Sequence, residues 1–344
     1  MQLHPTIQFL ASAEEPSRVR SGQTVAQPGS IPLSNLLVRR SRRHFMPMVR
    51  CWSLIVGLLG FLPVLNCLAQ EPEPTPVSTE ELLSELASAP IENPDRVARL
   101  KQLYEQAGAP AESITLQEVA GRRPDDPILH NVIVTKPGET NLVIVVGGHL
   151  DKVPAGHGVI DDWSGACLAS NLYQAIKHVP TRHTFVFMGF AYEEQGLVGS
   201  RLYVDQLGDE EVKSVRAMVN LECLGVGGPF VWSNGSNDDL EAIAHQVAKQ
   251  HDLPLESHMI RGVGADSIPF DRVGIPTITF DGLPLDRFEL IHSDKDRFEH
   301  VDSQVYENTY ALVLKYLLEL DRSEEIPDNQ HKALSDSPPN SVQK

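Results

Sequence analysis

Short apolar runs of strand length alternate with helical patterns through most of the 344-residue chain, and this alternation constrains the fold more than any other feature. Strand, helix and strand in succession build a parallel sheet, because a parallel pair needs a long crossover connection. We therefore expect one α/β domain around a mostly parallel sheet. The strand-like runs cover residues 130–135, 141–147, 183–191, 215–222, 229–234 and 276–281.

Helical patterns fill several gaps between these runs and extend beyond both ends. They are predicted at 79–88, 96–108, 164–179, 200–208, 238–252 and 305–321. Ser78 or Thr79 is expected to cap the first helix. The Pro-rich acidic residues 70–78 are interpreted as a linker, so that the domain spans 79–321, and the polar residues 322–344 are expected to be disordered.

The net charge of −17 is distributed unevenly along the chain. Residues 1–69 contain seven Arg, no Lys and two Glu, a net +5, which leaves −22 on residues 70–344. An acidic surface of this kind repels phosphate backbones, so no nucleic-acid partner is expected.

The basic N-terminal region ends in an apolar stretch, CWSLIVGLLGFLPVL at 51–65, that is short for a membrane span. The Arg cluster before it and the small residues after it predict a signal peptide over 1–69. The segment SRRHFM at 41–46 resembles a twin-arginine export signal. Alternatively, translation begins at Met46 or Met48. In both cases we expect an exported protein, periplasmic or extracellular, with no stable membrane span after cleavage.

Two of the four cysteines, Cys167 and Cys223, lie in the expected mature chain. An oxidising compartment allows a disulfide between them. Both fall in segments that look buried, where a free Cys packs as a small hydrophobe, so free thiols are the expectation.

Histidine and carboxylate side chains gather where predicted strands end. In GGHLDKVPAGHGVIDDWSG (147–165) a His and several Asp follow a buried run. Asp and Gly also form turns, but charged residues are rarely buried unless they are paired or bind a metal. In a parallel sheet, ligands bind beyond the carboxyl ends of the strands. We therefore predict a metal site built from these residues and from others after later strands: His149, Asp151, Asp161, Glu193, Glu194, Glu222 and His292.

The residue types indicate which metal and which chemistry. Imidazole and carboxylate without thiolate suit zinc in a catalytic role, because structural zinc usually draws on Cys. Two ions that share a carboxylate can activate a water and polarise a carbonyl group. One further carboxylate must stay unligated to accept the proton of that water, and the adjacent pair Glu193–Glu194 can meet both needs.

The order of the motifs resembles a known family. HLD, DDWSG, EEQGLVGS, NLE, ADSIPFDRVGIPTITF and IHSDKDRFEHVD, over roughly residues 80–320, are similar to the successive motifs of the co-catalytic zinc aminopeptidases. These form metallopeptidase family twenty-eight, which also contains relatives of glutamate carboxypeptidase and glutaminyl cyclase. The resemblance implies a three-layer α/β/α zinc-exopeptidase fold and an aminopeptidase that acts on peptides with a free N-terminus.

The resemblance also implies a role for each site residue. His149 and Glu222 would bind one zinc ion, Glu194 and His292 the other, and Asp161 would bridge the two. Many relatives have Asp at the position of Glu222, so the ion held by His149 and Glu222 is the less secure part of this assignment.

Further residues would support the ligands. Glu193 would be the general base and later the proton donor to the leaving amine. Asp151, two residues from His149 and on the same face of an extended chain, would orient that imidazole. Asp162 is interpreted as a turn-former.

The later motifs add weaker assignments. Asp266 is a possible substrate-side or supporting group, although Ser267 stands where relatives often have His. Asp296 and Asp302 fit the family pattern after His292. Four other histidines are expected only at the surface: His157, His178, His183 and His300.

Competing hypotheses remain at this point. A deacylase with an inserted lid domain is disfavoured, because only 70 residues separate Glu222 from His292. A glutaminyl-cyclase-like acyltransferase with one zinc stays open, as does a non-catalytic binding module on a peptidase scaffold. The sequence does not indicate the preferred side chain of the substrate or the oligomeric state.

Overall fold

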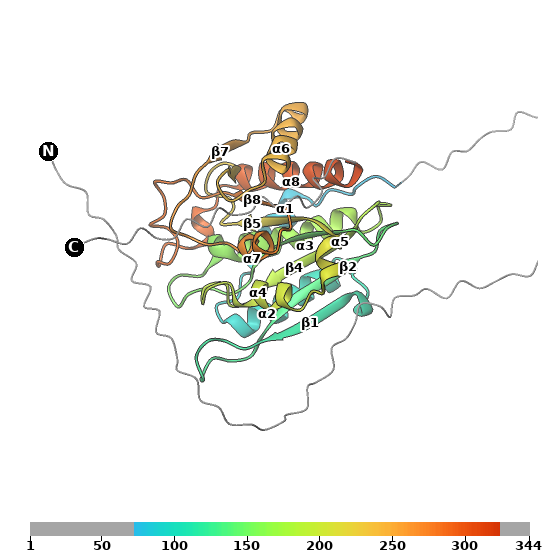
Figure 1. Cartoon of the computed structure of the whole chain (residues 1–344). Coiled ribbons are helices and arrows are strands. Elements are labelled where there is room, and N and C mark those ends of the chain that lie inside the picture. Colours follow the sequence, from blue (N-terminus) through green and yellow to red (C-terminus); the bar gives the residue numbers. More distant parts are fainter. Residues whose placement is uncertain (1–71, 324–344) are drawn as a thin grey trace, which may run out of the picture. The chain divides into compact units, whose positions relative to one another are not determined.

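An eight-stranded mixed sheet forms the centre of the molecule (Figure 1). The computed structural model describes residues 72–323. The strands lie in the order β1-β2-β4-β3-β5-β8-β6-β7, and the four central ones, β4, β3, β5 and β8, run parallel. Their bounds are β1 Ile114–Val119, β2 Leu129–Lys136, β3 Val143–His149, β4 Thr184–Phe190, β5 Val215–Glu222, β6 Phe230–Trp232, β7 Glu256–His258 and β8 Thr277–Asp281.

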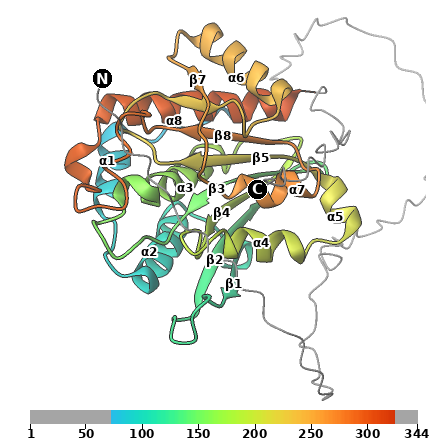
Figure 2. The same ribbon diagram turned by 60° about the vertical axis from the view of Figure 1, so that its left-hand side comes forward.

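Helices cover both faces of this sheet and give three layers (Figure 2). One face carries α1 Thr79–Ala87, α2 Asn93–Gln106, α3 Ser164–Ile176, α6 Asp238–His251 and α8 Ser303–Arg322. The other carries α4 Val198–Asp205, α5 Asp209–Ser214 and α7 Ser267–Arg272. The mostly parallel α/β fold expected from the sequence is confirmed.

Alternate residues of the central strands enter two different apolar cores. In β3, Ile144 and Val146 pack with the layer of α3 and α8, whereas Val145 packs with the layer of α4 and α7. In β5, Val219 packs with the layer of α3 and α8, and Met218 packs with the layer of α4 and α7. Because both faces are covered, the middle of each strand is apolar on successive residues, 143–146 in β3 and 217–219 in β5, rather than in an alternating pattern.

The predicted elements agree with the observed ones except at short or polar segments. The run 215–222 coincides with β5. Strands β1 and β7 were not predicted: β1 is largely exposed at one edge of the sheet, and β7 has three polar residues. Helices α5 and α7, of six residues each, were also missed, because one or two turns carry little periodicity.

The segment before α1 is attached to the domain. Thr75 N donates to Ala175 O (3.0 Å), and Val77, which is buried, donates from its N to the hydroxyl of Tyr310 (2.9 Å). Ser78 caps α1, with its side chain accepting from Glu81 N. The predicted signal peptide and residues 324–344 of the predicted tail lie outside the described residues, while Arg322, the first residue of that tail, belongs to the last helix.

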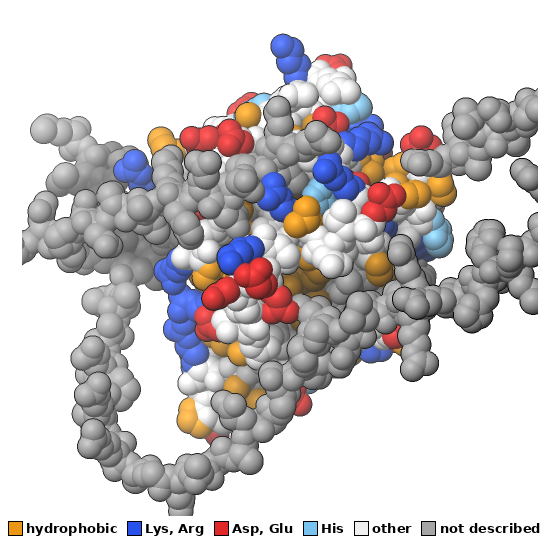
Figure 3. All heavy atoms as spheres, turned by 45° about the vertical axis from the view of Figure 1, so that its right-hand side comes forward, with side chains coloured by type: hydrophobic (Ala, Val, Ile, Leu, Met, Phe, Trp, Pro, Cys, Tyr) orange, Lys and Arg blue, Asp and Glu red, His pale blue; other side chains and the backbone are white. Residues whose placement is uncertain are grey.

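Three further properties bear on the sequence predictions. Cys167 and Cys223 are free and buried, as expected. Within residues 72–323, no helix combines the length and the apolar character that a membrane crossing needs. On the face in Figure 3, acidic and basic side chains both occur on the described domain, in several places next to one another.

Candidate metal centre

The candidate site lies at the carboxyl edge of the central parallel strands. His149 and Glu222 are the last residues of β3 and β5, and the pair Glu193–Glu194 follows β4 after a short turn. Because parallel strands end at one edge of a sheet, residues far apart in sequence meet there. Asp161 comes from the irregular turn Val159–Trp163 that leads into α3, and His292 from the segment after β8.

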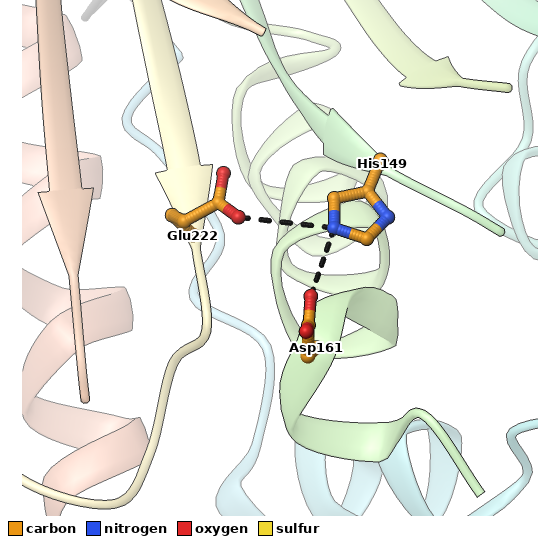
Figure 4. A group of neighbouring side chains, drawn as sticks. All are labelled: His149, Asp161 and Glu222. Atoms are coloured by element: carbon orange, nitrogen blue, oxygen red, sulfur yellow. Dashed lines mark hydrogen bonds and ion pairs between the residues drawn. The ribbon is translucent and has the colours of Figure 1, made fainter. Parts of the chain in front are cut away.

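His149, Asp161 and Glu222 form one buried group (Figure 4). The Nε2 atom of His149 lies 3.0 Å from Asp161 Oδ1 and 3.7 Å from Glu222 Oε1. One donor atom from each residue lies within 4.8 Å of the other two, a spacing that a single metal ion can span. We call these residues the buried group.

Asp161, Glu194 and His292 form a second group that shares one member with the first. His292 Nε2 lies 3.1 Å from Asp161 Oδ2 and 3.0 Å from Glu194 Oε2. The side chain of His292 is 49% exposed, so this group faces solvent, and we call it the open group. Asp161 directs one carboxylate oxygen to each group.

The residues fit a pair of divalent cations. Glu194 Oε1 is buried and has no hydrogen-bond partner in the structure, a costly state for a carboxylate unless a cation lies beside it. His149 Nδ1 is 3.0 Å from the backbone O of Asp151, so that Nδ1 donates and the lone pair of Nε2 faces the carboxylates. Hydrogen bonds to Asp161 and Glu194 raise the pKa of His292 to about 10, which shows that this position favours positive charge.

Glu193 belongs to neither group, although it lies beside both. Its Oε2 is 4.0 Å from His149 Nε2, and burial raises the pKa of its carboxyl well above the usual range. Tyr192, directly before it, has a left-handed backbone conformation with φ of 58°. This turn gives the adjacent Glu193 and Glu194 different directions, as an unligated base beside a ligand requires.

Asp151 supports the site in a different way from the one expected. Its backbone carbonyl, rather than its carboxylate, binds the imidazole of His149; the carboxylate Oδ1 is 3.8 Å from Nδ1. The carboxylate instead accepts from the backbone N of Glu193 (3.0 Å) and of Glu194 (3.3 Å). Burial raises the pKa of Asp151 to about 6. Asp151 therefore holds the loop that carries the two glutamates.

The later motifs also reach the site. Asp296 is buried and accepts from Ile160 N (2.7 Å) and Asp161 N (3.3 Å), so it fixes the backbone of the shared ligand. Asp266 is fully buried with neither carboxylate oxygen hydrogen-bonded. Burial raises its pKa to about 7, and it lies near enough to raise the pKa of Glu193. Asp302 is the N-cap of α8.

Asp162, in the turn before α3, accepts from Gly165 N, which agrees with a turn-forming role, and it is completely buried. One expectation about a polar residue was wrong. His183, expected at the surface, is buried too, with its Nδ1 3.1 Å from Asp321 Oδ1 at the opposite end of the sheet. In both cases a tertiary partner far away in the sequence satisfies the polar group.

Arg96 is a supporting residue that the sequence did not reveal. It is buried in α2, and its guanidinium donates to backbone carbonyls of the loop between His149 and Asp161: Leu150 O, His157 O (2.9 Å) and Gly158 O (2.6 Å). It also lies 5.2 Å from the ring centroid of Trp163. In a helical pattern an Arg is usually taken as solvent-facing, so no local signal could have identified it.

Similar proteins include aminopeptidases of known sequence and structure. Aminopeptidase YwaD of Bacillus subtilis (strain 168) is 26% identical over 204 residues, which are 56% of this chain and 44% of that protein. Leupeptin-inactivating enzyme 1 of Streptomyces exfoliatus is 28% identical over 151 residues, 43% of this chain and 34% of that protein. The chain thus spans less than half the length of these two relatives.

Solved structures share the fold at lower identity. BSAP, a zinc aminopeptidase from Bacillus subtilis, matches with a TM-score of 0.54 and 24% identity, over 59% of this chain and 53% of that one. A glutaminyl cyclase from an Acidobacteriales bacterium matches with a TM-score of 0.60 and 16% identity, over 73% of this chain and 98% of that one.

A family model also matches the sequence. Residues 131–317, more than half of the chain, match the model of peptidase family M28. The matched range contains both groups and Glu193. The chain therefore belongs to peptidase family M28.

Proposed function

We propose that this protein is an exported, zinc-dependent aminopeptidase that removes N-terminal amino acids from peptides. The observation that carries the proposal is the pair of overlapping groups, in which each oxygen of Asp161 faces a different histidine. Membership of family M28 and the similarity to aminopeptidases support the same activity.

The residues present would hold two zinc ions about a shared carboxylate. His149, Asp161 and Glu222 would bind one, and Asp161, Glu194 and His292 the other. Ions bound there would polarise the scissile carbonyl and lower the pKa of the attacking water. The exposure of His292 makes the open group the side from which substrate enters.

Glu193 performs the proton transfers in this proposal. As a carboxylate it accepts a proton from the attacking water, and as the acid it passes that proton to the leaving amine. The burial of its carboxyl favours the protonated form, which makes the first transfer, from the water to Glu193, less costly. Asp151 keeps Glu193 and Glu194 in place through their backbone amides.

Export is the second part of the proposal and is supported by the sequence alone. The Arg-rich segment and the apolar stretch at 51–65 have the order of a signal peptide. Fractionation of the native host, with N-terminal sequencing of the protein, tests this part. A mature N-terminus near residue 70 in the periplasmic or extracellular fraction is the expected result, and an uncleaved cytoplasmic protein would contradict it.

The activity is tested with residues 70–344, a panel of aminoacyl-nitroanilides and metal analysis of the same preparation. We expect two zinc ions per chain and hydrolysis that a chelator abolishes. Glu193→Gln should lower kcat by about 10²- to 10⁴-fold while both ions are retained. The matched control is Glu289→Gln, an exposed glutamate in the segment before His292, which should hydrolyse the panel at the parent rate.

Other outcomes would reassign the activity. Retention of parent activity in Glu193→Gln would remove the proposed base. Release of ammonia from N-terminal glutaminyl peptides by a preparation with one zinc ion would indicate a glutaminyl-cyclase reaction instead. Two bound zinc ions with no turnover of either substrate class would leave a binding protein on a peptidase scaffold.

A further inference from the structure

The carboxylate of Asp162 binds backbone amides from three separate segments of the site. Its Oδ2 accepts from His149 N (3.1 Å), and its Oδ1 accepts from Gly165 N (3.0 Å) and Cys223 N (2.9 Å). The residue is completely buried, and it belongs to neither group of candidate ligands among the described residues. A buried carboxylate with this many amide donors is well satisfied and holds its donors firmly.

Asp162 and its contacts lie at or next to each member of the buried group in the chain. His149 is itself a ligand, Asp161 directly precedes Asp162 in the chain, and Cys223 directly follows Glu222. The three ligands come from β3, the turn before α3, and β5. One carboxylate therefore fixes the backbone at all three.

Two glycines make room for this carboxylate. A Cβ atom at Gly148 would lie 2.4 Å from Asp162 Oδ2, and one at Gly165 would lie 2.5 Å from the same atom. Both would also crowd the backbone O of Leu221, at 2.5 and 2.4 Å. Any side chain at either position would displace the carboxylate or the end of β5, so the site is shaped around Asp162.

The turn after Glu222 needs a restraint of this kind. Cys223 has φ of 49°, a left-handed conformation that non-glycine residues adopt at a cost. The hydrogen bond from Cys223 N to Asp162 stabilises that conformation. Glu222 then ends β5 with its Oε1 toward His149.

The carboxylate of Asp151 supports the backbone of the loop that carries Glu194 of the open group. Asp151 is as deeply buried as Asp162, and its carboxylate also accepts backbone amides, but those of Glu193 and Glu194. No contact between Asp162 and Glu194 or His292 occurs within the described part of the chain that would give it the same role in the open group.

We propose that Asp162 is the positioning residue of the buried group, so that it controls the affinity for the ion held by His149, Asp161 and Glu222 and not for the ion of the open group. The proposal rests on the two-ion site of the proposed function. A lost supporting contact typically lowers metal affinity by roughly 10- to 100-fold. Asp162→Asn should produce this loss at one ion only, because an amide NH₂ would face at least one backbone N–H.

The test uses residues 70–344 dialysed against buffered zinc, followed by elemental analysis. At a free zinc concentration that keeps two ions on the parent, Asp162→Asn should keep one. The cobalt-loaded variant should give the absorption spectrum of His149→Ala, which lacks a ligand of the buried group, rather than that of His292→Ala. The matched control is Asp151→Asn, which removes the same charge from an equally buried position. Its cobalt-loaded form should give the absorption spectrum of His292→Ala.

Several results would overturn the proposal. Retention of both ions by a folded Asp162→Asn protein would do so. An equal loss of affinity for both ions in Asp162→Asn and Asp151→Asn would also overturn it, because it would indicate a general effect of the lost charge. If Asp162→Asn does not fold, amide hydrogen exchange of the parent protein in the presence of a chelator tests the proposal instead. The amides of Gly165 and Cys223 should stay protected from exchange in the metal-free protein. Fast exchange at these two amides would refute the role of Asp162. A parent that binds fewer than two ions would refute the proposed function instead.

Discussion

Replacement of Arg96 by Met should destabilise the protein, because the guanidinium donates hydrogen bonds to several buried or partly buried carbonyls. It donates to the backbone O of Leu150 and Gly158, both buried, and to those of His157 and Pro90, both partly buried. Met has similar length and flexibility but no donor. Among the described residues, the carbonyl of Leu150 would lose its hydrogen-bond donor, and that of Gly158 would keep only the bond from Trp163 N (3.2 Å).

The magnitude follows from these contacts. An orphaned buried carbonyl, here Leu150 O, costs about 1–3 kcal/mol, and the lost hydrogen bond from the charged guanidinium to Gly158 O costs about 1.5–3 kcal/mol, together about 2.5–6 kcal/mol. Burial lowers the pKa of Arg96 to about 10. Desolvation of the buried charge therefore offsets part of the stabilisation that its hydrogen bonds provide. The expected net loss is about 3 kcal/mol in the free energy of unfolding, a large share of the usual 5–15 kcal/mol of a domain.

Thermal and urea denaturation of the purified variants measure the effect. A loss of about 3 kcal/mol corresponds to a midpoint lower by roughly 6–12 °C in a domain of this size. Arg99→Met, on the same helix, is the control, because two of its three hydrogen bonds reach side chains at the surface; its effect should stay within about 0.5 kcal/mol. Equal midpoints for the two variants would refute the account of Arg96.

Three further predictions concern the rest of the molecule. Removal of metal by a chelator should lower the thermal midpoint, because the clustered carboxylates then lose their counter-charge; calorimetry that shows no change would contradict a resident metal. Burial favours the protonated acid at Asp321, but hydrogen bonds from the side chain and the N of His183 lower its pKa below the usual value. Its stabilisation is therefore present above the ordinary pKa of Asp and is lost as pH falls through the lower folded value, so Asp321→Asn should cost more stability in urea denaturation at pH 6 than near pH 3. Cys167 and Cys223 should react with a thiol reagent only when the chain is unfolded; fast reaction of either in the native protein would contradict their burial.

The sequence predicted the fold class because the central strands are covered on both faces. Residues 143–146 and 217–219 are apolar without interruption, and the 13-residue helix Ser164–Ile176 lies between them. Segments that gain their structure only from a neighbour were missed. β7, with the sequence ESH, pairs with β6 at the edge of the sheet, and nothing in its own residues indicates a strand.

The candidate ligands could be named from the sequence because each stands at the end of a strand or in a motif that resembles a family pattern. Their supporting contacts could not. Asp162 and Asp151 were understood as a turn-former and an imidazole partner, yet both bind amides of residues 42 to 61 positions away. Hydrogen bonds of this kind depend on where the backbone of another strand end lies.

The sequence by itself determined the longer elements, their order and the residue types of the candidate site, since strand length, helical periodicity and donor type are local properties. Only the tertiary structure decided which oxygen of Asp161 faces which histidine, how Glu193 and Glu194 diverge, and why Arg96 is buried. The physical reason is that a buried charged group takes its partners from whatever segments the fold brings within about 3 Å, and sequence separation carries no information about that distance.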